Sequence, residues 1–305
     1  MSLTSWNEGP ARTAILEFVD RVTEEGGTDF VPPAERVAVL DNDGTLWCER
    51  PTYTQALFVF ARLGEAAAAR PELAEQPVVK ALLAGDLAGA QQYGLEAIAG
   101  VLLQLDAGRT TEEFTRDVVD WFAAAEHPQL GRPFRDLTYA PMIELMELLR
   151  SRGFRVFIVT GGGVEFVRAV GQELYGVPPD DVVGSAVQVS FERRDGRIVL
   201  VRQAAMLGSP NEGPPKAVNI QAHIGSRPIF AVGNSAGDNE MLEYAHTGER
   251  PSLCLVVDHD DDEREYAYAG GSATNPDAVP IVDTAGRLGW TVVSMRRDWN
   301  RVFAE

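Results

Sequence analysis

Residues 37–47 read VAVLDNDGTLW, and this stretch decides the fold. The apolar run Val37–Leu40 is too short and too continuous for an amphipathic helix and is typical of a buried strand. Asp41 and Asp43 follow at once, and two carboxylates this close repel each other and raise each other's pKa. Three explanations are open for the pair: a calcium loop, an acidic turn, or a catalytic pair that shares a cation.

The composition is that of a soluble globular protein. The chain has 305 residues, 45% hydrophobic and 24% charged, enough for one large α/β domain or a core with an insertion. The net charge of −18 disfavours nucleic acid and anionic membranes, because both attract basic surfaces. Cys48 and Cys254 form no disulfide or zinc pattern. Without a membrane-length apolar run or signal-peptide features, we expect a cytoplasmic protein.

Helical and strand-like segments alternate along most of the chain. Residues 141–152 are expected to form a helix that ends at Gly153, and residues 154–159 a strand. Further strands are expected at residues 228–232 and 253–257. This alternation predicts a parallel sheet, whose ligands bind beyond the carboxyl ends of the strands.

Two other segments interrupt the alternation. Residues 182–191 and 197–201 are expected to pair as a hairpin around Asp195-Gly196, a strong turn signal. Residues 52–126 are rich in alanine, leucine and glutamate and contain no convincing strand. We expect about four helices there, one of them opened by the capping box of residues 110–113.

The calcium explanation for the aspartate pair fails on spacing. A calcium loop that starts at Asp41 needs a glycine at its sixth position, where this chain has Leu46. The acidic turn stays open, because Asp-Gly pairs are common in turns. In the catalytic explanation, Asp41 attacks a phosphoryl group while Asp43 protonates the leaving oxygen and then activates water. A divalent cation between the two carboxylates would offset their repulsion.

Two segments have features of a phosphate site. Residues 160–163, Thr-Gly-Gly-Gly, lie between a strand and a helix, where backbone N–H groups and the threonine hydroxyl can bind an anion. They fit neither the dinucleotide nor the P-loop motif, and a purely structural turn stays open. Lys216 opens a helix, where it is either a solvated surface charge or a phosphate-binding cation.

A possible magnesium loop follows another expected strand. Residues 233–238, GNSAGD, contain Asn234 and Asp238, whose oxygens are ligands of the kind that Mg²⁺ takes. The alternative is a loop whose polar side chains bond only to the loop itself. Asp41, Thr160 and Asn234 each follow a strand, so we expect them to converge on one edge of the sheet.

These four motifs, in this order, resemble those of the haloacid dehalogenase superfamily of hydrolases. The resemblance implies a Rossmann-like three-layer αβα core with a parallel sheet, and a phosphatase that hydrolyses a small phosphomonoester through an aspartyl-phosphate. It makes Asp41 the nucleophile and Asp43 the general acid/base. The phosphate-binding residues that it implies are Thr160, Gly161, Gly162 and Lys216. The Mg²⁺ ligands that it implies are Asp41, the Asp43 backbone carbonyl, Asn234 and Asp238.

The helical insertion is similar to the type-one cap of phosphoserine phosphatase-like members. The domains implied are a core of residues 1–46 and 130–305 and a cap of residues 47–129. A cap closes over the site, excludes water and selects the leaving group. Glu49 is a candidate for substrate specificity through a cationic substrate group, although phosphoserine phosphatases have their glutamate one residue further on, where this chain has Arg50.

One further position departs from the family pattern. Many members have aspartate where this chain has Asn234, so the metal meets one negative charge fewer.

The alternatives left open are a phosphomutase and a non-catalytic metal- or phosphate-binding module. The expected partner is a small phosphorylated metabolite, with no nucleic acid and no membrane. The motifs fix neither the particular substrate nor the oligomeric state.

Two remaining features are interpreted as structural. Residues 258–263 are acidic, but Glu263 stands where a calcium loop needs glycine, so we expect a solvated acidic loop. Trp47 and Tyr53 are aromatic side chains next to a buried strand, and we expect both in the core. The four histidines have no ligand spacing and receive no role.

Overall fold

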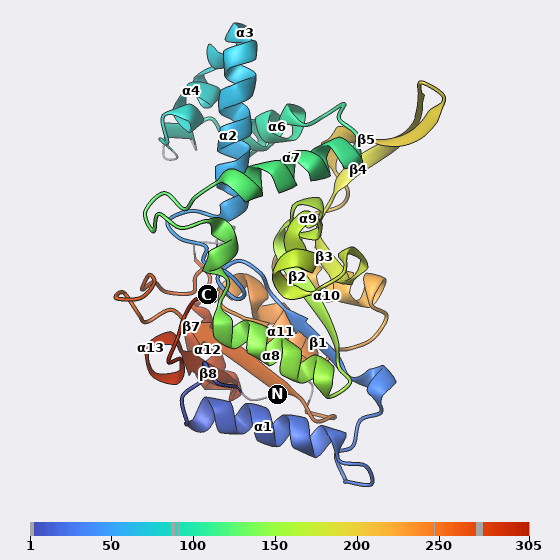
Figure 1. The fold of residues 1–305 in the computed structure, drawn as a ribbon, viewed down its shortest axis with the longest axis vertical. Helices are drawn as coiled ribbons and strands as arrows, with labels where there is room; N and C mark the ends of the chain where they lie inside the picture. Colours follow the sequence, from blue (N-terminus) through green and yellow to red (C-terminus); the bar gives the residue numbers. More distant parts are fainter. Residues whose placement is uncertain (1–2, 87–88, 91, 247, 273–276, 305) are drawn as a thin grey trace.

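A six-stranded parallel sheet forms the centre of the protein, with the strand order β3-β2-β1-β6-β7-β8 (Figure 1). The computed structural model describes residues 3–86, 89–90, 92–246, 248–272 and 277–304. The strands of the sheet are β1 Val37–Leu40, β2 Arg155–Gly163, β3 Val182–Ser185, β6 Phe230–Gly233, β7 Leu253–Asp258 and β8 Thr291–Ser294.

Helices cover both faces of this sheet. One face carries α1 Pro10–Thr23, α8 Ala140–Ser151 and α9 Val164–Tyr175. The other carries α10 Pro214–His223, α11 Asn239–Ala245 and α12 Ile281–Leu288. A short α13, Met295–Asp298, follows β8.

The side chains of β1 reach both of these layers. Ala38 and Leu40 pack in the core cluster under α1, α8 and α9, whereas Val37 and Val39 pack in the cluster under α10, α11 and α12. All four are fully buried, because successive residues of a strand point to opposite faces of the sheet and both faces are covered. The predicted three-layer α/β core with a parallel sheet is confirmed.

Helix α8 ends as expected, but one predicted strand was wrong. Gly153 has φ +78°, the left-handed conformation that stops α8. Residues 182–185 were expected in a hairpin, yet Val182 pairs with Ile158 of β2 in the central sheet. The two valines that open β3 are buried on the sheet, and only Gly184, Ser185 and Ala186 separate them from the start of the next strand.

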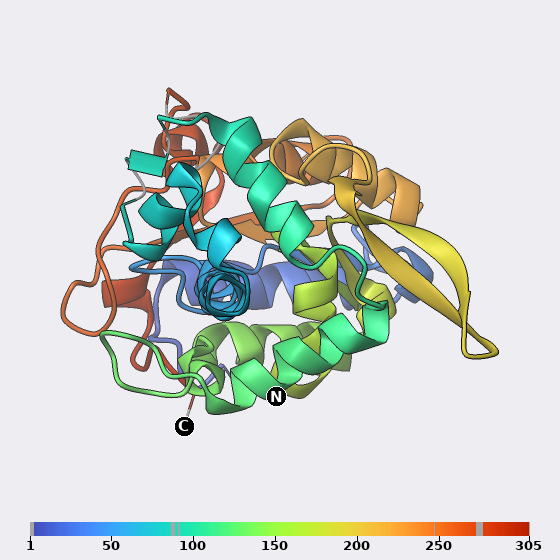
Figure 2. The same cartoon turned by 90° about the horizontal axis from the view of Figure 1, so that it is seen from above.

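The hairpin itself begins later than predicted. It consists of β4 Val187–Arg194 and β5 Arg197–Met206, joined at Asp195 and Gly196. Both turn residues have positive φ, +50° and +77°, as the two-residue turn of a twisted hairpin requires. Figure 2 shows the hairpin, in yellow, extending away from the rest of the molecule.

The segment between β1 and α8 is helical over most of its length. The helices described in it are α2 Thr54–Ala69, α3 Pro71–Ala74, α4 Pro77–Leu83, α6 Leu95–Leu105 and α7 Thr111–Ala124. They are stacked beyond one end of the sheet (Figure 1), and α2, α4 and α6 share a small apolar core of their own. The capping box that opens α7 is present, with Thr110 Oγ1 accepting the Glu113 N–H at 3.1 Å. The structure describes five helices in this segment, where about four were expected.

The two ends of this helical segment are joined to each other. The Cys48 N–H donates to the Leu137 carbonyl at 3.1 Å, and the Tyr139 N–H donates to the Leu46 carbonyl at 2.8 Å. Trp47 is buried between them and stacks on Phe122 of α7 at 5.8 Å, which confirms its place in the core.

Tyr53 does not share that position. Its side chain is 42% exposed, so the expectation of a core residue was wrong there. Tyr53 directly precedes α2, where the chain has already turned away from the sheet. In the described part of the chain, no helix is both long enough and apolar enough to cross a membrane.

Candidate active site

The polar residues singled out in the sequence meet at the carboxyl ends of three neighbouring strands. Asp41 follows β1, Thr160 lies in β2 and Asn234 follows β6, and β1 lies between β2 and β6 in the sheet. From β1 the chain moves to β2 on one side, while β6 continues the sheet on the other. Asp41 and Asn234 therefore flank the point where the winding of the sheet reverses, which is the usual ligand site of such sheets.

A lysine links two carboxylates at the centre of this site. Lys216, from the first turn of α10, is 2% exposed, and its Nζ lies 2.5 Å from Asp41 Oδ1 and 2.5 Å from Asp238 Oδ1. Burial alone would lower the pKa of Lys216, but the ion pairs with Asp238 and Asp41 outweigh it and raise the pKa. The lysine is therefore a permanent cation of the site and not a surface charge.

The two carboxylates of the first motif have different surroundings. Burial, together with the nearby Asp238 charge, raises the pKa of Asp41 well above its ordinary value, against the effect of Lys216. Burial also raises the pKa of Asp43, while a hydrogen bond from the Trp47 indole N–H at 2.9 Å acts in the opposite direction. The indole holds the Asp43 side chain in one orientation, two residues from Asp41.

The threonine and glycines of the second motif lie in the strand itself. Strand β2 continues to Gly163, with an irregular register after Val159, instead of ending before Thr160 as expected. Thr160 is fully buried, and its Oγ1 accepts the Gly162 N–H at 2.9 Å. The Gly163 N–H donates to Gln55 Oε1 at 2.7 Å. A side chain from the helical segment thus already contacts the glycine-rich strand end.

Asn234 is bonded at both ends of its amide. Thr45 Oγ1 donates to Asn234 Oδ1 at 3.1 Å, and Asn234 Nδ2 donates to Glu49 Oε1 at 3.2 Å. Glu49 is 6% exposed, and burial raises its pKa to about 7. Its carboxylate therefore contacts the loop after β6. Gly44, at φ +75°, lets the backbone pass close to both side chains, since a Cβ there would overlap the Asn234 amide and lie 2.8 Å from Glu49 Cδ.

A histidine to which the sequence assigned no role supports the first motif. His259 Nε2 lies 2.7 Å from the Gly44 carbonyl oxygen, and its Nδ1 lies 3.2 Å from Glu265 Oε2. Glu265 Oε1 also accepts the Tyr139 hydroxyl at 3.0 Å. His259 and Glu265 are both buried, so a pair of polar side chains fixes the position of the Gly44 backbone.

The expected solvated acidic loop was therefore wrong for part of residues 258–263. His259 and Asp261 are buried, and Asp261 forms an ion pair with Arg264. Positions 257, 259 and 261 are buried, whereas positions 258 and 260 are partly exposed. The polar side chains of this segment gave no sign in the sequence that two of them would be buried.

Asn211 and Gln55 are two further residues of the site that the sequence did not single out. Asn211 is fully buried, and its Nδ2 donates to the Thr160 carbonyl at 2.8 Å. Gln55 is the second residue of α2 and lies over the glycines. A single Asn in a loop or a single Gln at the start of a helix matches no sequence motif. Only the folded chain shows that Asn211 and Gln55 belong to the site.

The donors of the site fit a hard divalent cation. Asp41, Asp43 and Asp238 supply carboxylate oxygens, Asn234 supplies an amide oxygen, and Lys216 neutralises only part of the carboxylate charge. Oxygen-rich sites with excess negative charge are those that Mg²⁺ occupies. Over the described ranges, no group of three or more His, Cys, Asp or Glu side chains is arranged to hold a metal ion by itself. Backbone and amide oxygens would therefore complete the set of metal ligands.

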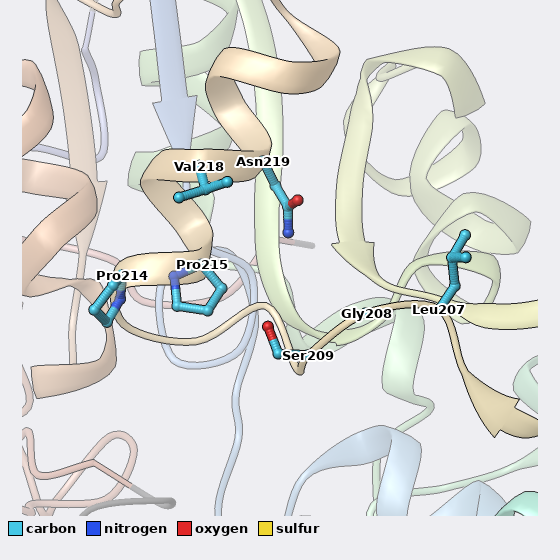
Figure 3. Close-up of a pocket in the computed structure, with 7 residues that line it drawn as sticks. All are labelled: Leu207, Gly208, Ser209, Pro214, Pro215, Val218 and Asn219. Atoms are coloured by element: carbon cyan, nitrogen blue, oxygen red, sulfur yellow. The ribbon is translucent and has the colours of Figure 1, made fainter.

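A separate cavity lies at the base of the hairpin. Its volume is about 350 Å³, and Figure 3 shows it between the start of α10 and the loop that follows β5. The residues that line it are Leu207, Gly208, Ser209, Pro214, Pro215, Val218 and Asn219. None of them belongs to the four motifs, so this cavity is distinct from the candidate active site.

The fold and the cluster at its strand ends define an enzyme of the parallel α/β class. Within that class, the chain belongs to the haloacid dehalogenase-like hydrolase family, whose model matches residues 38–243. The matched range begins in β1 and ends in α11, so it contains every residue of the cluster from Asp41 to Asp238.

Solved structures with a similar fold have little sequence in common with this chain. A conserved protein of unknown function from Anaerococcus prevotii is 14% identical, with 93% of this chain and 91% of that chain covered and a TM-score of 0.56. A protein of unknown function from Bordetella pertussis is 17% identical, with 85% and 98% covered and a TM-score of 0.47. A phosphoserine phosphohydrolase-like protein from Francisella tularensis is 17% identical, with 73% and 87% covered and a TM-score of 0.40. No curated protein matches the chain significantly.

Proposed function

We propose that the protein is a Mg²⁺-dependent phosphatase that hydrolyses a small phosphomonoester through an aspartyl-phosphate on Asp41. The observation that carries this proposal is the buried Asp41 carboxylate held 2.5 Å from the Lys216 ammonium, with Asp43 two residues away. A carboxylate nucleophile, a fixed cation and a second carboxylate are the groups that phosphoryl transfer to an enzyme side chain needs.

The phosphate group would bind between Lys216 and the start of α9. Lys216, Thr160, Gly161 and Gly162 are the proposed phosphate ligands, and phosphate would replace Thr160 Oγ1 as the acceptor of the Gly162 N–H. Because the ion pairs keep Lys216 protonated, its charge is available to the phosphate oxygens in both the ground state and the transition state. Bound by Asp41, the Asp43 carbonyl, Asn234 and Asp238, Mg²⁺ would offset the repulsion between carboxylate and phosphate.

The two aspartates would divide the chemistry. An Asp41 carboxylate oxygen attacks phosphorus in line as the bond to the alkoxide leaving group breaks. Asp43 gives its proton to that alkoxide, and the raised pKa of its buried carboxyl group favours the protonated form that this step requires. Asp43 then takes a proton from water, which attacks the aspartyl-phosphate, and free phosphate leaves with Asp41 regenerated.

We also propose that residues 47–129 act as a cap over this site. The helices of this segment are stacked beyond the strand ends, and Gln55 reaches from α2 to the Gly163 N–H. A closed cap would exclude water from the aspartyl-phosphate until the alcohol has left. Gln55 is therefore our candidate for a cap residue that contacts the substrate.

The proposal is tested by phosphate release from p-nitrophenyl phosphate and from a panel of small phosphate esters, with and without Mg²⁺. Asp41→Asn should lower the Mg²⁺-dependent rate by about three orders of magnitude or more, because the nucleophile is lost. The exposed Asp120→Asn is the matched control and should keep the wild-type rate. Absence of turnover on the whole panel with Mg²⁺ would overturn the proposal, and an isomer formed without free phosphate would indicate a mutase.

A further inference from the structure

Glu49 is a buried carboxylate without an ion-pair partner. It is 6% exposed, and across the described residues no Lys, Arg or His nitrogen lies within 4 Å of its oxygens. The charged side chains that act on its pKa are His259, Asp43 and Arg50. Arg50 stacks on the Tyr268 ring at 4.2 Å, and the His259 nitrogens are directed to Gly44 and Glu265.

Glu49 accepts a hydrogen bond from the amide that faces the candidate metal site. Asn234 Nδ2 donates to Glu49 Oε1 at 3.2 Å, and Asn234 is itself 1% exposed. With the nitrogen directed to Glu49, Oδ1 lies at the other end of the amide and accepts a hydrogen bond from Thr45 Oγ1 at 3.1 Å. The asparagine therefore presents an oxygen beside the loop of Asp41 and Asp43, with a carboxylate directly behind its nitrogen.

A carboxylate that accepts an amide N–H acts on the oxygen of the same amide. The hydrogen bond polarises the amide and increases the negative charge on its oxygen, as carboxylates do behind histidine ligands of metals. The carboxylate also adds its own charge to the electrostatic field at the site. Burial strengthens both effects, because little water screens them.

We propose that Glu49 supplies, through the Asn234 amide, part of the negative charge with which this site holds Mg²⁺. Glu49 is then a positioning residue behind the metal and not a contact of the substrate. The inference rests on the proposed Mg²⁺ dependence. Asn234 then supplies the oxygen ligand, and Glu49 supplies the negative charge that an aspartate at position 234 would carry.

The alternative is that Glu49 only holds the loop together by its hydrogen bond. Glu49→Gln separates the two roles, because the glutamine carbonyl has the same shape and still accepts from Asn234 Nδ2 but carries no charge. Asn234→Asp adds a second carboxylate beside Glu49, and the double variant Glu49→Gln with Asn234→Asp has one carboxylate and one amide in exchanged places.

The experiment measures the thermal melting temperature of each variant against Mg²⁺ concentration, without substrate, and then the Mg²⁺ concentration that gives half-maximal phosphate release. Glu49→Gln should weaken the apparent Mg²⁺ affinity about 10- to 100-fold. The double variant should return it to within about threefold of wild type. Asn234→Asp alone should melt lower than wild type in EDTA, since two buried carboxylates then face each other. Glu17→Gln, exposed on α1, should behave as wild type.

Unchanged Mg²⁺ affinity in Glu49→Gln would overturn the inference and leave the proposed phosphatase intact. A double variant that binds Mg²⁺ no better than Glu49→Gln would overturn it as well. If Glu49→Gln does not fold, the double variant decides: Mg²⁺ affinity within about threefold of wild type supports the inference, and affinity about tenfold weaker or more overturns it. If neither the melting temperature nor the phosphate release of the wild-type protein depends on Mg²⁺, both the proposed metal dependence and the inference are overturned.

Discussion

Lys216 Nζ lies 2.5 Å from Asp41 Oδ1, although 175 positions separate the two residues in the chain. Both are buried, and the ammonium is shared with Asp238. A buried ion pair contributes little net stability when it is intact, because the desolvation of both charges offsets the attraction. Its removal is costly, because the remaining charges stay buried without a partner.

Lys216→Met should therefore destabilise the fold. We expect the free energy of unfolding to fall by about 3–5 kcal/mol at neutral pH, since two carboxylates lose their common counter-ion. Urea unfolding followed by circular dichroism measures this change. Addition of Asp238→Asn should recover part of the loss, and the exposed Lys80→Met should leave stability nearly unchanged. Full stability in Lys216→Met would contradict the geometry of the site.

Gly44→Ala should damage both the fold and the site. At φ +75° an alanine is strained, and its Cβ would overlap the Asn234 amide. Gly26 has φ +82° and open space where a Cβ would lie, so Gly26→Ala isolates the conformational cost of about 1–2 kcal/mol. We expect Gly44→Ala to lose a further 1–3 kcal/mol, roughly the cost of overpacking, and most of its phosphate release. Equal losses of unfolding free energy in Gly44→Ala and Gly26→Ala would mean that the Asn234 side chain moves aside without cost.

Glu265→Gln should change stability in a pH-dependent way. Burial would raise the pKa of Glu265, but the hydrogen bond and charge of His259, together with hydrogen bonds from Cys48 and the Tyr266 N–H, outweigh it, so the folded pKa lies below the ordinary value. Such a carboxylate stabilises the fold above the unfolded pKa, and this contribution is lost as the pH falls through the folded pKa. We expect a deficit of about 1–3 kcal/mol at pH 7 that shrinks as the pH is lowered below about 4.5. Thermal melts from pH 3 to 8 measure it.

The exposed Glu263→Gln is the control for this series and should follow the wild-type curve at every pH. A deficit of Glu265→Gln that stayed constant across the range would show that the carboxylate charge is irrelevant to the contact with His259.

Gln55→Glu should weaken substrate binding more than it slows the reaction. Gln55 Oε1 accepts the Gly163 N–H at the proposed phosphate site, so a carboxylate there would repel the phosphate group. We expect KM for p-nitrophenyl phosphate to rise about tenfold or more, with a smaller change in kcat. Gln104→Glu, an exposed change of the same kind on α6, is the control. An unchanged KM would place Gln55 outside the path of the substrate.

Local patterns predicted the elements that depend on local physics. The strand Val37–Leu40, the stop at Gly153, the capping box and the Asp195-Gly196 turn follow from burial, φ preferences and hydrogen bonds between near neighbours. The boundary between β3 and the hairpin was missed, because the short Gly184-Ser185-Ala186 break was taken as part of one strand, and only the different partners of β3 and β4 in the fold separate them.

The site could be predicted by residue type but not by contact. Lys216 looks like a surface lysine in the sequence, and only its pairing with Asp41 shows why it is buried. His259 contacts Gly44 across 215 positions, and nothing near either residue in the sequence indicates the other. Glu49 was a candidate for substrate specificity in the sequence, but its contact with Asn234 was visible only in the folded chain.

The bonds that tie Cys48 to Leu137 and Leu46 to Tyr139 have a wider consequence. The chain leaves the sheet and returns to it at one place, so the intervening residues form an insertion whose two ends are held together. The entropy cost of closing such an insertion grows only slowly with its length. A change in the length of the segment therefore adds little closure cost. If residues 47–129 act as the proposed cap, the molecules that they admit can change while Asp41, Asp43 and Lys216 stay where they are.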